Sequence, residues 1–439
     1  MRKYARYKDS GISWIGNVPE HWDVVPFRSE FSLGKGLPIT KDNLINDEIN
    51  GVPVVSYGQI HSKENEGTVL KRNLLRFVES SWLDSNPQSL LRKNDIVFAD
   101  TSEDLDGCGN CVLNTETRKI FAGYHTIIAF TNKEENGPFF AYLFQSDIWR
   151  SQIRTRVNGV KVYSVTRAHL KRCKLLLPPL SEQKAIAEYL DKKTAQINEL
   201  VSAKQKQIEL LKEYKQSVIA NAVTGKLNKN CRMKDSGISW IGKIPENWEK
   251  LPFGALFEQK SQCGHCDEEL LSVYLDKGVI RFSDGGEKRA NATSEDLSKY
   301  QLVEVGDFVL NNQQAWRGSV GVSFFRGIVS PAYVILKMSE KLERNFANYL
   351  LRDRSMVAMY CICSKGVGSI QRNLVWNKLK RMPVFVPPLS EQKEIVAYIE
   401  KKVASIDSQI ASIENQIANL NEYKQSLISD VVTGKVKVC

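Results

Sequence analysis

The chain has 439 residues, which is enough for two or three domains with separate cores. Hydrophobic residues make up 42% and charged residues 25%, and no apolar run approaches the ~20 residues that span a bilayer. The first residues, MRKYARYKDSGISW, lack the apolar core of a signal peptide, so we expect a cytoplasmic protein. The net charge of +11, from 61 basic and 50 acidic residues, favours a polyanionic partner such as nucleic acid.

The first feature along the chain is a motif that returns in the second half. Residues 8–22 read KDSGISWIGNVPEHW and residues 234–248 read KDSGISWIGKIPENW, with 12 of 15 positions identical. We call these two stretches the A motifs. Such self-similarity indicates an internal duplication.

The segment after the first A motif is predicted to mix strands, loops and short helices. Strands are expected at 52–57, 95–99 and 125–130, and a helix at 138–146. After the second A motif, the corresponding strands are expected at 271–275, 307–310 and 333–336, and the helix at 345–353. The two variable segments, 23–177 and 249–386, differ in length by 17 residues and share little sequence.

A second repeat follows each variable segment and is predicted to be a long helix. Residues 178–226 begin PPLSEQKAIAEYL and end with VTGK, and residues 387–435 begin PPLSEQKEIVAYI and end the same way. In the first copy Ser181 is expected to cap the helix, Glu182 lies in its first turn and Gly225 ends it. The corresponding residues of the second copy are Ser390, Glu391 and Gly434.

Both long helices carry an apolar stripe with the 3-4 spacing of a coiled coil. The stripe is interrupted by Lys204 and Lys215 in the first helix and by Lys424 in the second. A helix of ~42 residues is ~63 Å long and cannot bury such a stripe alone. We therefore expect the two helices to pair antiparallel with pseudo-twofold symmetry, the alternative being that each docks on its own domain.

Loops of the variable segments carry residue types that read bases or hold phosphates. Asn and Gln can pair with adenine, Arg with guanine, and basic side chains with phosphate. The candidates in the first half are Tyr57, Gln59, His61, Arg154, Arg156, Asn158, Lys161 and Tyr163. The candidates in the second half are Asn312, Gln313, Trp316, Arg317, Gln371, Arg372 and Asn373.

The cysteines and the search for catalytic motifs give no strong sign of an enzyme. Cys263-Gly-His-Cys266 matches the active-site string of thiol oxidoreductases, but the strand and helix that this fold requires around it are not predicted. A zinc site that adds Cys361 and Cys363 is a second alternative. We find no phosphate-binding loop, methyltransferase motif or histidine pair, so no catalytic residue and no metal ligand is assigned.

Taken together, the doubled DSGIxWIGxxPxxW motif, the doubled PPLSEQK helix start and their order resemble the specificity (S) subunits of type I restriction-modification enzymes. The resemblance covers the whole chain. It implies an α+β protein with two tandem mixed α/β target recognition domains, each followed by a long helix of an antiparallel coiled coil. The expected boundaries are 1–177 and 227–386 for the recognition domains, and 178–226 and 387–439 for the helices.

The resemblance also implies how such a chain works. Each recognition domain reads one half of an asymmetric, bipartite site in double-stranded DNA, and the coiled coil sets the spacing. Two modification subunits that use S-adenosylmethionine methylate adenine, and two restriction subunits that use ATP and Mg²⁺ translocate and cleave DNA. The chain itself is expected to need no cofactor. The alternatives are a coiled-coil scaffold that binds only proteins, and a thiol oxidoreductase that uses Cys263 and Cys266.

Overall fold

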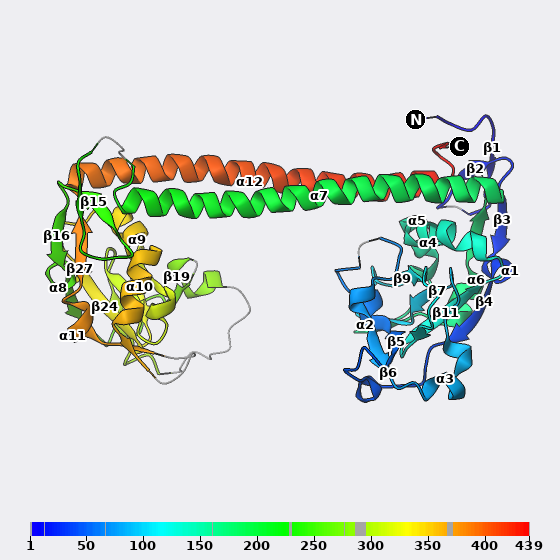
Figure 1. The fold of residues 1–439 in the computed structure, drawn as a ribbon, viewed down its shortest axis with the longest axis horizontal. Coiled ribbons are helices and arrows are strands. Elements are labelled where there is room, and N and C mark those ends of the chain that lie inside the picture. Colours follow the sequence, from blue (N-terminus) through cyan, green and yellow to red (C-terminus); the bar gives the residue numbers. More distant parts are fainter. Residues whose placement is uncertain are drawn as a thin grey trace. The chain divides into compact units, whose positions relative to one another are not determined.

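The computed structural model describes residues 2–12, 14–65, 67–159, 161–227, 231–275, 277–285, 296–366 and 372–438 (Figure 1). The chain forms two compact units: unit 1 is Met1–Gln205 with Glu414–Cys439, and unit 2 is Lys206–Ile413. Each unit thus holds one A motif, one variable segment and parts of both long helices. Within the described residues, no helix is both long and apolar enough to cross a membrane.

Unit 1 is built on an antiparallel sheet of four strands with the order β4-β11-β7-β9. Their bounds are β4 (Phe31–Lys35), β11 (Thr126–Thr131), β7 (Ile96–Ala99) and β9 (Cys111–Leu113). A smaller sheet contains β10 (Phe121–Ala122), β5 (Val52–Val55) and β6 (Arg76–Val78). The unit also contains the helices α4 (Gly137–Gln145) and α5 (Asp147–Arg154).

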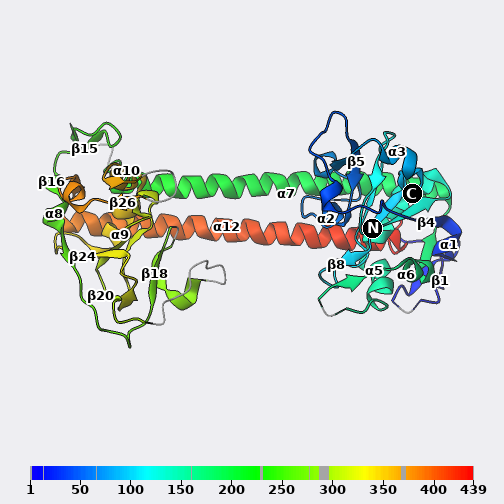
Figure 2. The same cartoon turned by 90° about the horizontal axis from the view of Figure 1, so that it is seen from below.

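Unit 2 repeats the four-stranded sheet in the same order, β17-β24-β21-β22. Its strand β24 is labelled in Figure 2. These strands are β17 (Phe257–Lys260), β24 (Tyr333–Met338), β21 (Phe308–Asn311) and β22 (Val320–Val322). Its remaining elements include β18 (Leu271–Tyr274), α9 (Arg344–Arg352) and α10 (Arg354–Ile362). The mixed α+β fold expected for each half is confirmed, and the structure places all six strands and both helices within two residues of their predicted positions.

The strand expected at 52–57 is shorter than predicted, because it ends at Val55. Tyr57–Ile60 instead forms a short helix, α2. Ser56 precedes this helix, and the Gln59 side chain accepts a hydrogen bond from the Ser56 backbone N–H at 2.9 Å. This local capping bond competes with the sheet and turns the chain out of it.

The two ends of each variable segment are paired in a short ladder. In unit 1, β3 (Asp23–Pro26) pairs antiparallel with β13 (Lys174–Leu177). In unit 2, β16 (Glu249–Pro252) pairs in the same way with β27 (Pro383–Val386). Because each segment leaves and rejoins the repeated part at one place, its length can change without altering that part.

The two predicted helices are α7 (Leu180–Val223) and α12 (Leu389–Val432). They begin one residue before the serines expected to cap them, so that expectation was wrong. The first helical bond runs from the Gln183 N–H to the Pro179 carbonyl at 3.0 Å. The Gln183 side chain also donates to the Pro178 carbonyl at 2.8 Å, so it joins the helix start to the end of the preceding strand.

Within each unit, α7 and α12 run antiparallel and share a buried seam. In unit 1 Ile197 and Leu427 belong to one apolar core, and in unit 2 Ala222 and Ile399 belong to another. The expected coiled coil is thus confirmed, and the cores of the recognition segments continue into it. Neither helix contains glycine or proline, which would break it.

The three lysines that interrupt the apolar stripes all bond to the facing helix. Lys204 donates to the Gln416 side chain at 2.5 Å, and Lys424 donates to the Asn198 side chain at 3.0 Å. Lys215 forms an ion pair with Asp407 at 2.8 Å. Polar pairs inside an apolar seam fix its register, because a slipped register leaves each of them without a partner.

Each A motif forms a hairpin that holds the start of the helix in its own half. The hairpins are β1 (Tyr7–Asp9) with β2 (Asn17–Pro19), and β14 (Met233–Asp235) with β15 (Lys243–Pro245). After the first hairpin the buried Trp22 donates its indole N–H to Glu182 at 2.9 Å, and after the second Trp248 donates to Glu391 at 3.0 Å. The carboxylates expected to face the helix dipole therefore also anchor the A motifs.

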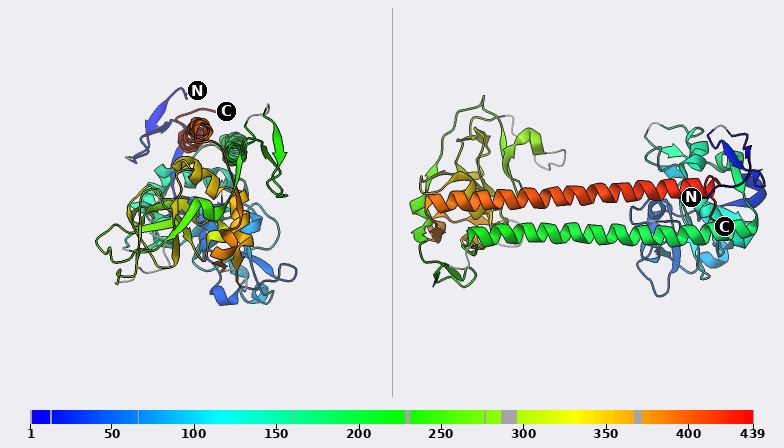
Figure 3. Two further views of the ribbon diagram at one scale, coloured as in Figure 1. Left: turned by 90° about the vertical axis from the view of Figure 1, so that its left-hand side faces the viewer. Right: turned by 90° about the horizontal axis from the view of Figure 1, so that it is seen from above.

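Each A motif also packs on the end of the helix from the other half (Figure 3). Gly434, after the end of α12, has a φ of +72° and lies so close to Pro19 that a Cβ would collide with it. Gly225, after the end of α7, has a φ of +78° and lies equally close to Pro245. The repeated sequences are thus explained together, since a motif in each half contacts both repeated helix ends.

Candidate nucleic-acid interface

Three segments meet at one end of the four-stranded sheet in each unit. In unit 1 the Asp100 N–H donates to the His125 carbonyl at 3.1 Å, and the Val165 N–H donates to the Asp100 carbonyl at 2.8 Å. In unit 2 Asn312 stands in the place of Asp100. Its N–H donates to the Ala332 carbonyl, and its carbonyl accepts from the Leu374 N–H, both at 3.2 Å. This shared geometry makes the loops 100–110 and 312–319 equivalent, and we call them the hairpin loops.

In unit 2 this junction brings together two candidate clusters that are far apart in sequence. The guanidinium groups of Arg317 and Arg372 each lie 4.8 Å from the centre of the Trp316 ring. The indole N–H donates to the Gln313 carbonyl at 3.1 Å. The aromatic ring therefore holds two planar cations in a fixed orientation beside the loop.

The other candidates of unit 2 surround this ring. The Asn312 side chain accepts a hydrogen bond from the Leu374 N–H at 3.1 Å, and the Gln313 side chain is exposed. Asn373 begins β26 (Asn373–Leu374) and is exposed beside them. Gln371 lies outside the described residues.

In unit 1 the junction brings Tyr57 next to two aromatic residues that were not predicted. The Tyr57 ring centre lies 5.7 Å from that of Tyr124 and 5.4 Å from that of His125. His125 lies in the turn between β10 and β11. Its φ is +55°, and its side chain is 56% exposed. A non-glycine residue in this backbone region is uncommon, and this signal cannot be read from sequence.

His61 is bonded within the protein through both ring nitrogens. Its Nε2 lies 2.8 Å from the Thr101 carbonyl and its Nδ1 lies 2.9 Å from the Asn110 side-chain amide. Thr101 and Asn110 lie near the two ends of the hairpin loop. His61 therefore fixes the loop, and neither nitrogen is left for a base.

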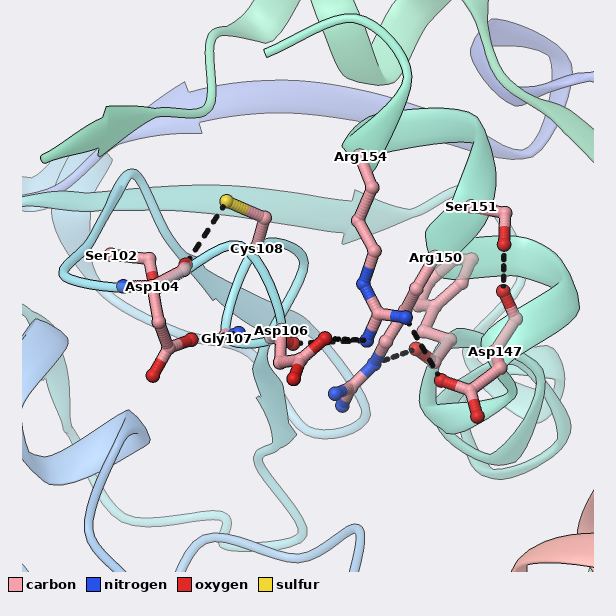
Figure 4. Close-up of polar contacts among 10 residues, drawn as sticks. Ser102, Asp104, Asp106, Gly107, Cys108, Asp147, Arg150, Ser151 and Arg154 are labelled. Carbon is pink, nitrogen blue, oxygen red and sulfur yellow. Dashed lines mark hydrogen bonds and ion pairs between the residues drawn. The ribbon is translucent and has the colours of Figure 1, made fainter. Parts of the chain in front are cut away.

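The basic candidates of unit 1 separate into bonded and exposed residues. Arg154 pairs with Asp147 at 3.1 Å and donates to the Asp106 carbonyl at 3.0 Å, so it joins α5 to the hairpin loop (Figure 4). Arg156 donates to the Gln152 carbonyl. Asn158 and Lys161 are exposed. Tyr163 lies in β12 (Tyr163–Ser164), at the position that corresponds to Arg372 in unit 2.

The hairpin loop of unit 1 was missed as a candidate because it is acidic. It carries Glu103, Asp104 and Asp106 with exposed side chains, whereas the loop of unit 2 carries amides and Arg317. Carboxylates repel phosphate, so they do not stand out as DNA-binding residues, but they can accept a hydrogen bond from the amino group of cytosine. The equivalent loop of unit 2 carries candidate residues, so the repeat itself could have pointed to the hairpin loop of unit 1.

The cysteines that raised a redox or zinc alternative do not gather in one place. Cys263 and Cys266 are exposed free thiols, Cys361 is half-buried next to Arg372, and Cys363 is buried. Burial raises the pKa of Cys363, which keeps its thiol protonated. Among the described residues, no three His, Cys, Asp or Glu side chains are grouped so as to hold a metal ion.

The family model for the type I restriction modification DNA specificity domain matches residues 19–210 and again residues 245–420. The chain belongs to this family. It is a specificity subunit with two tandem recognition domains, and in this family catalysis lies in other subunits. Specificity subunits need no cofactor of their own.

Known specificity subunits match the chain over almost its whole length. It is 23% identical to the EcoKI specificity subunit of Escherichia coli K12, over 96% of this chain and 90% of that protein. It is 24% identical to the putative MjaX specificity subunit of Methanocaldococcus jannaschii, over 97% of this chain and 96% of that protein.

Two solved structures share the fold of this specificity subunit. The HsdS subunit from Thermoanaerobacter tengcongensis aligns with a TM-score of 0.52 and 17% identity, over 95% of this chain and 98% of that one. A chain from a structure of the type I R-M system aligns with a TM-score of 0.65 and 16% identity, over 95% of this chain and 99% of that one.

Proposed function

We propose that this specificity subunit reads an asymmetric, bipartite DNA site, with one recognition domain for each half. Residues 1–177 and 227–386 serve as the recognition domains, and residues 178–226 and 387–439 serve as the helices that set the spacing between the half-sites. The chain makes no covalent change to DNA.

The observation that carries this proposal is a shared junction with different side chains. The same hydrogen bonds hold Asp100 in unit 1 and Asn312 in unit 2, and Tyr163 stands where unit 2 has Arg372. An aspartate and an amide accept or donate different hydrogen bonds, and arginine, unlike tyrosine, can bind guanine through two parallel bonds. Two readers of different chemistry favour two different half-sites.

The proposed DNA-contacting residues are those at the two junctions and on the exposed turns beside them. In unit 2 they are Asn312, Gln313, Trp316, Arg317, Gln371, Arg372 and Asn373. In unit 1 they are Tyr57, Gln59, Arg154, Arg156, Asn158, Lys161 and Tyr163, while His61 acts by holding the hairpin loop.

The repeated hairpins are the proposed docking sites for the partner subunits. Trp14 and Trp240 occupy the same position in the two A motifs, and their side chains are 42% and 46% exposed. Exposed tryptophans are frequent anchors of protein interfaces, and their repetition fits two copies of one partner. We infer two modification subunits that use S-adenosylmethionine and two restriction subunits that use ATP and Mg²⁺, all acting in the cytoplasm.

A direct test is to reconstitute the chain with its modification subunit and measure binding to a library of DNA duplexes. We expect selection of a bipartite site whose two halves differ, with affinity that falls steeply as salt rises. Binding without sequence preference would contradict the proposal.

The two alternatives are tested by variants. A protein-only scaffold predicts that Arg317→Glu with Arg372→Glu leaves DNA binding unchanged while the partner complex stays intact; we expect DNA binding to be lost. A thiol oxidoreductase predicts that Cys263→Ala with Cys266→Ala abolishes function; we expect methylation at the wild-type level.

A further inference from the structure

A polar cleft opens in unit 1 between the recognition domain and the helix pair. It encloses about 520 Å³. Its walls come from the loop that contains Asn65 and Gly67, from α4 and α5, from the hairpin loop and from α12. The lining residues are Asn65, Gly67, Asp106, Gln145, Asp147, Arg150, Arg154, Lys424 and Gln425.

Arg150 lines this cleft and forms no ion pair within the described residues. Its Nε donates to the Phe144 carbonyl at 3.0 Å, and its two terminal amino groups make no hydrogen bond to the part of the chain that the structure describes (Figure 4). The two nearby aspartates, Asp147 and Asp106, are engaged by Arg154 instead. Burial lowers the pKa of Arg150, which reflects the cost of holding this cation away from water.

Lys424 supplies a second positive charge from α12. Its ammonium group donates to the neutral side chain of Asn198 at 3.0 Å, so this bond does not neutralise it. The described walls therefore hold three cations, Arg150, Arg154 and Lys424, against two carboxylates, Asp106 and Asp147, which leaves an excess of positive charge. An unpaired half-buried cation is costly unless an anion binds to it.

Unit 2 provides an internal comparison, because the residues that correspond to Arg150 and Lys424 are neutral or ion-paired there. Arg150 is the fourth residue after the N-cap of α5, and the fourth residue after the N-cap of α10 is Val357. Lys424 corresponds to Lys215, whose facing residue is Asp407 at 2.8 Å. Arg354 bridges from α10 to Gln216 at 2.9 Å. The positive cleft thus belongs to unit 1 and is not required by the fold.

We propose that this cleft binds a phosphate group, held by the Arg150 guanidinium and the Lys424 ammonium. Guanidinium groups bind phosphate oxygens through short, charge-assisted hydrogen bonds, and an ammonium adds a second contact. Asp106 and Arg154 join the cleft to the hairpin loop. We therefore assign the bound phosphate to the DNA backbone, next to the first half-site. This assignment rests on the proposed function.

The test measures how DNA binding depends on salt concentration and compares variants with the wild type. The protein used is the complex of this chain with its modification subunit. We expect Arg150→Gln to weaken binding to all sequences about tenfold and to reduce the slope of log affinity against log salt by about 0.9. Arg150→Lys keeps the charge and is expected to keep most of the slope. Lys215→Gln, which alters the unit 2 counterpart of Lys424, is expected to leave the slope unchanged.

A second measurement separates DNA phosphate from free phosphate. Thermal unfolding of the complex is followed in inorganic phosphate and in chloride at equal ionic strength. An unchanged DNA slope in Arg150→Gln, with stabilisation by phosphate in the wild type only, would support a site for free phosphate. No change in either measurement would overturn the phosphate site.

Two further outcomes separate the phosphate site from a purely structural role of Arg150 and from the proposed function. Glu66 follows Asn65 in sequence and lies outside the described residues, so Glu66→Gln is included. Equal losses of DNA affinity in Glu66→Gln and Arg150→Gln would mean that Arg150 serves as a partner for that carboxylate, and would overturn the phosphate site. Wild-type binding without sequence preference would overturn the proposed function, while the salt slopes would still decide on the phosphate site.

Discussion

Glu182 joins the first A motif to the first long helix. It accepts hydrogen bonds from Tyr4 at 3.1 Å, His21 at 2.7 Å and Trp22 at 2.9 Å. Partial burial acts to raise the pKa of Glu182, but the bonds from Trp22, His21 and Tyr4 outweigh it and lower that pKa below 4.5. The lowered pKa means that ionised Glu182 stabilises the fold above about pH 4.5, and that this contribution is lost as the pH falls through the folded-state pKa.

We therefore predict that Glu182→Gln destabilises the protein by about 1–2 kcal/mol at pH 7 and has a smaller effect at pH 4. The measurement is the urea midpoint of unfolding at both pH values. Glu188→Gln, an exposed change on the same helix, is the control. An identical pH dependence in the wild type and in Glu182→Gln would contradict this role.

Arg372 is the residue whose loss should alter base recognition most cleanly. It stacks on Trp316 and also contacts the Cys361 thiol at 3.4 Å, so its guanidinium is held in place before DNA binds. We predict that Arg372→Ala costs about 1–3 kcal/mol of binding free energy and relaxes the preference at one base of one half-site. Tyr163→Ala, the matched change, should alter only the other half-site. Uniform weakening at every position in both variants would show that these residues hold phosphates instead.

The ends of the long helices depend on a backbone conformation that favours glycine. Gly434 combines a positive φ with close contact to Pro19, whereas Gly16 has a φ of +69° but faces open space. We predict that Gly434→Ala destabilises unit 1 by roughly 1–3 kcal/mol, and by more than Gly16→Ala does. Thermal unfolding of the two variants measures the difference. Equal losses would mean that backbone strain alone, and not packing against Pro19, sets the cost.

The sequence predicted elements better than the contacts between them. Apolar periodicity located both long helices, and the paired motifs located the duplication. Local patterns could not show that Trp22 bonds to Glu182 or that Gly434 packs on Pro19, because these partners lie 160 and 415 residues apart in the chain. The helix starts were misplaced because a glutamine side chain, and not the serine, bonds back to the Pro-Pro carbonyl.

The candidate interface was predictable in unit 2 and only partly in unit 1. Amides, arginines and a tryptophan are recognisable DNA-binding residue types, and the structure brings the clusters around Trp316 and Arg372 together. The acidic hairpin loop and the backbone conformation of His125 carry no such signature. His61 was chosen by residue type, but its environment uses both ring nitrogens.

For the whole molecule, each unit needs the end of the helix that begins in the other half. The C-terminal segment after Gly434 even pairs with the N-terminus, where the Lys437 N–H donates to the Arg2 carbonyl at 2.8 Å. A repeated frame of this kind supports two variable segments, each inserted through one short ladder. We propose that these two segments read different halves of one DNA site.

The most direct measurement of that claim is a map of methylated adenines in the host genome with the gene present, deleted and restored. We predict that deletion removes methylation at one asymmetric, bipartite motif, that restoring the wild-type chain returns it, and that Arg372→Ala changes one half of the motif only. Methylation that is unchanged by deletion, or a lost motif that is a palindrome, would contradict the account.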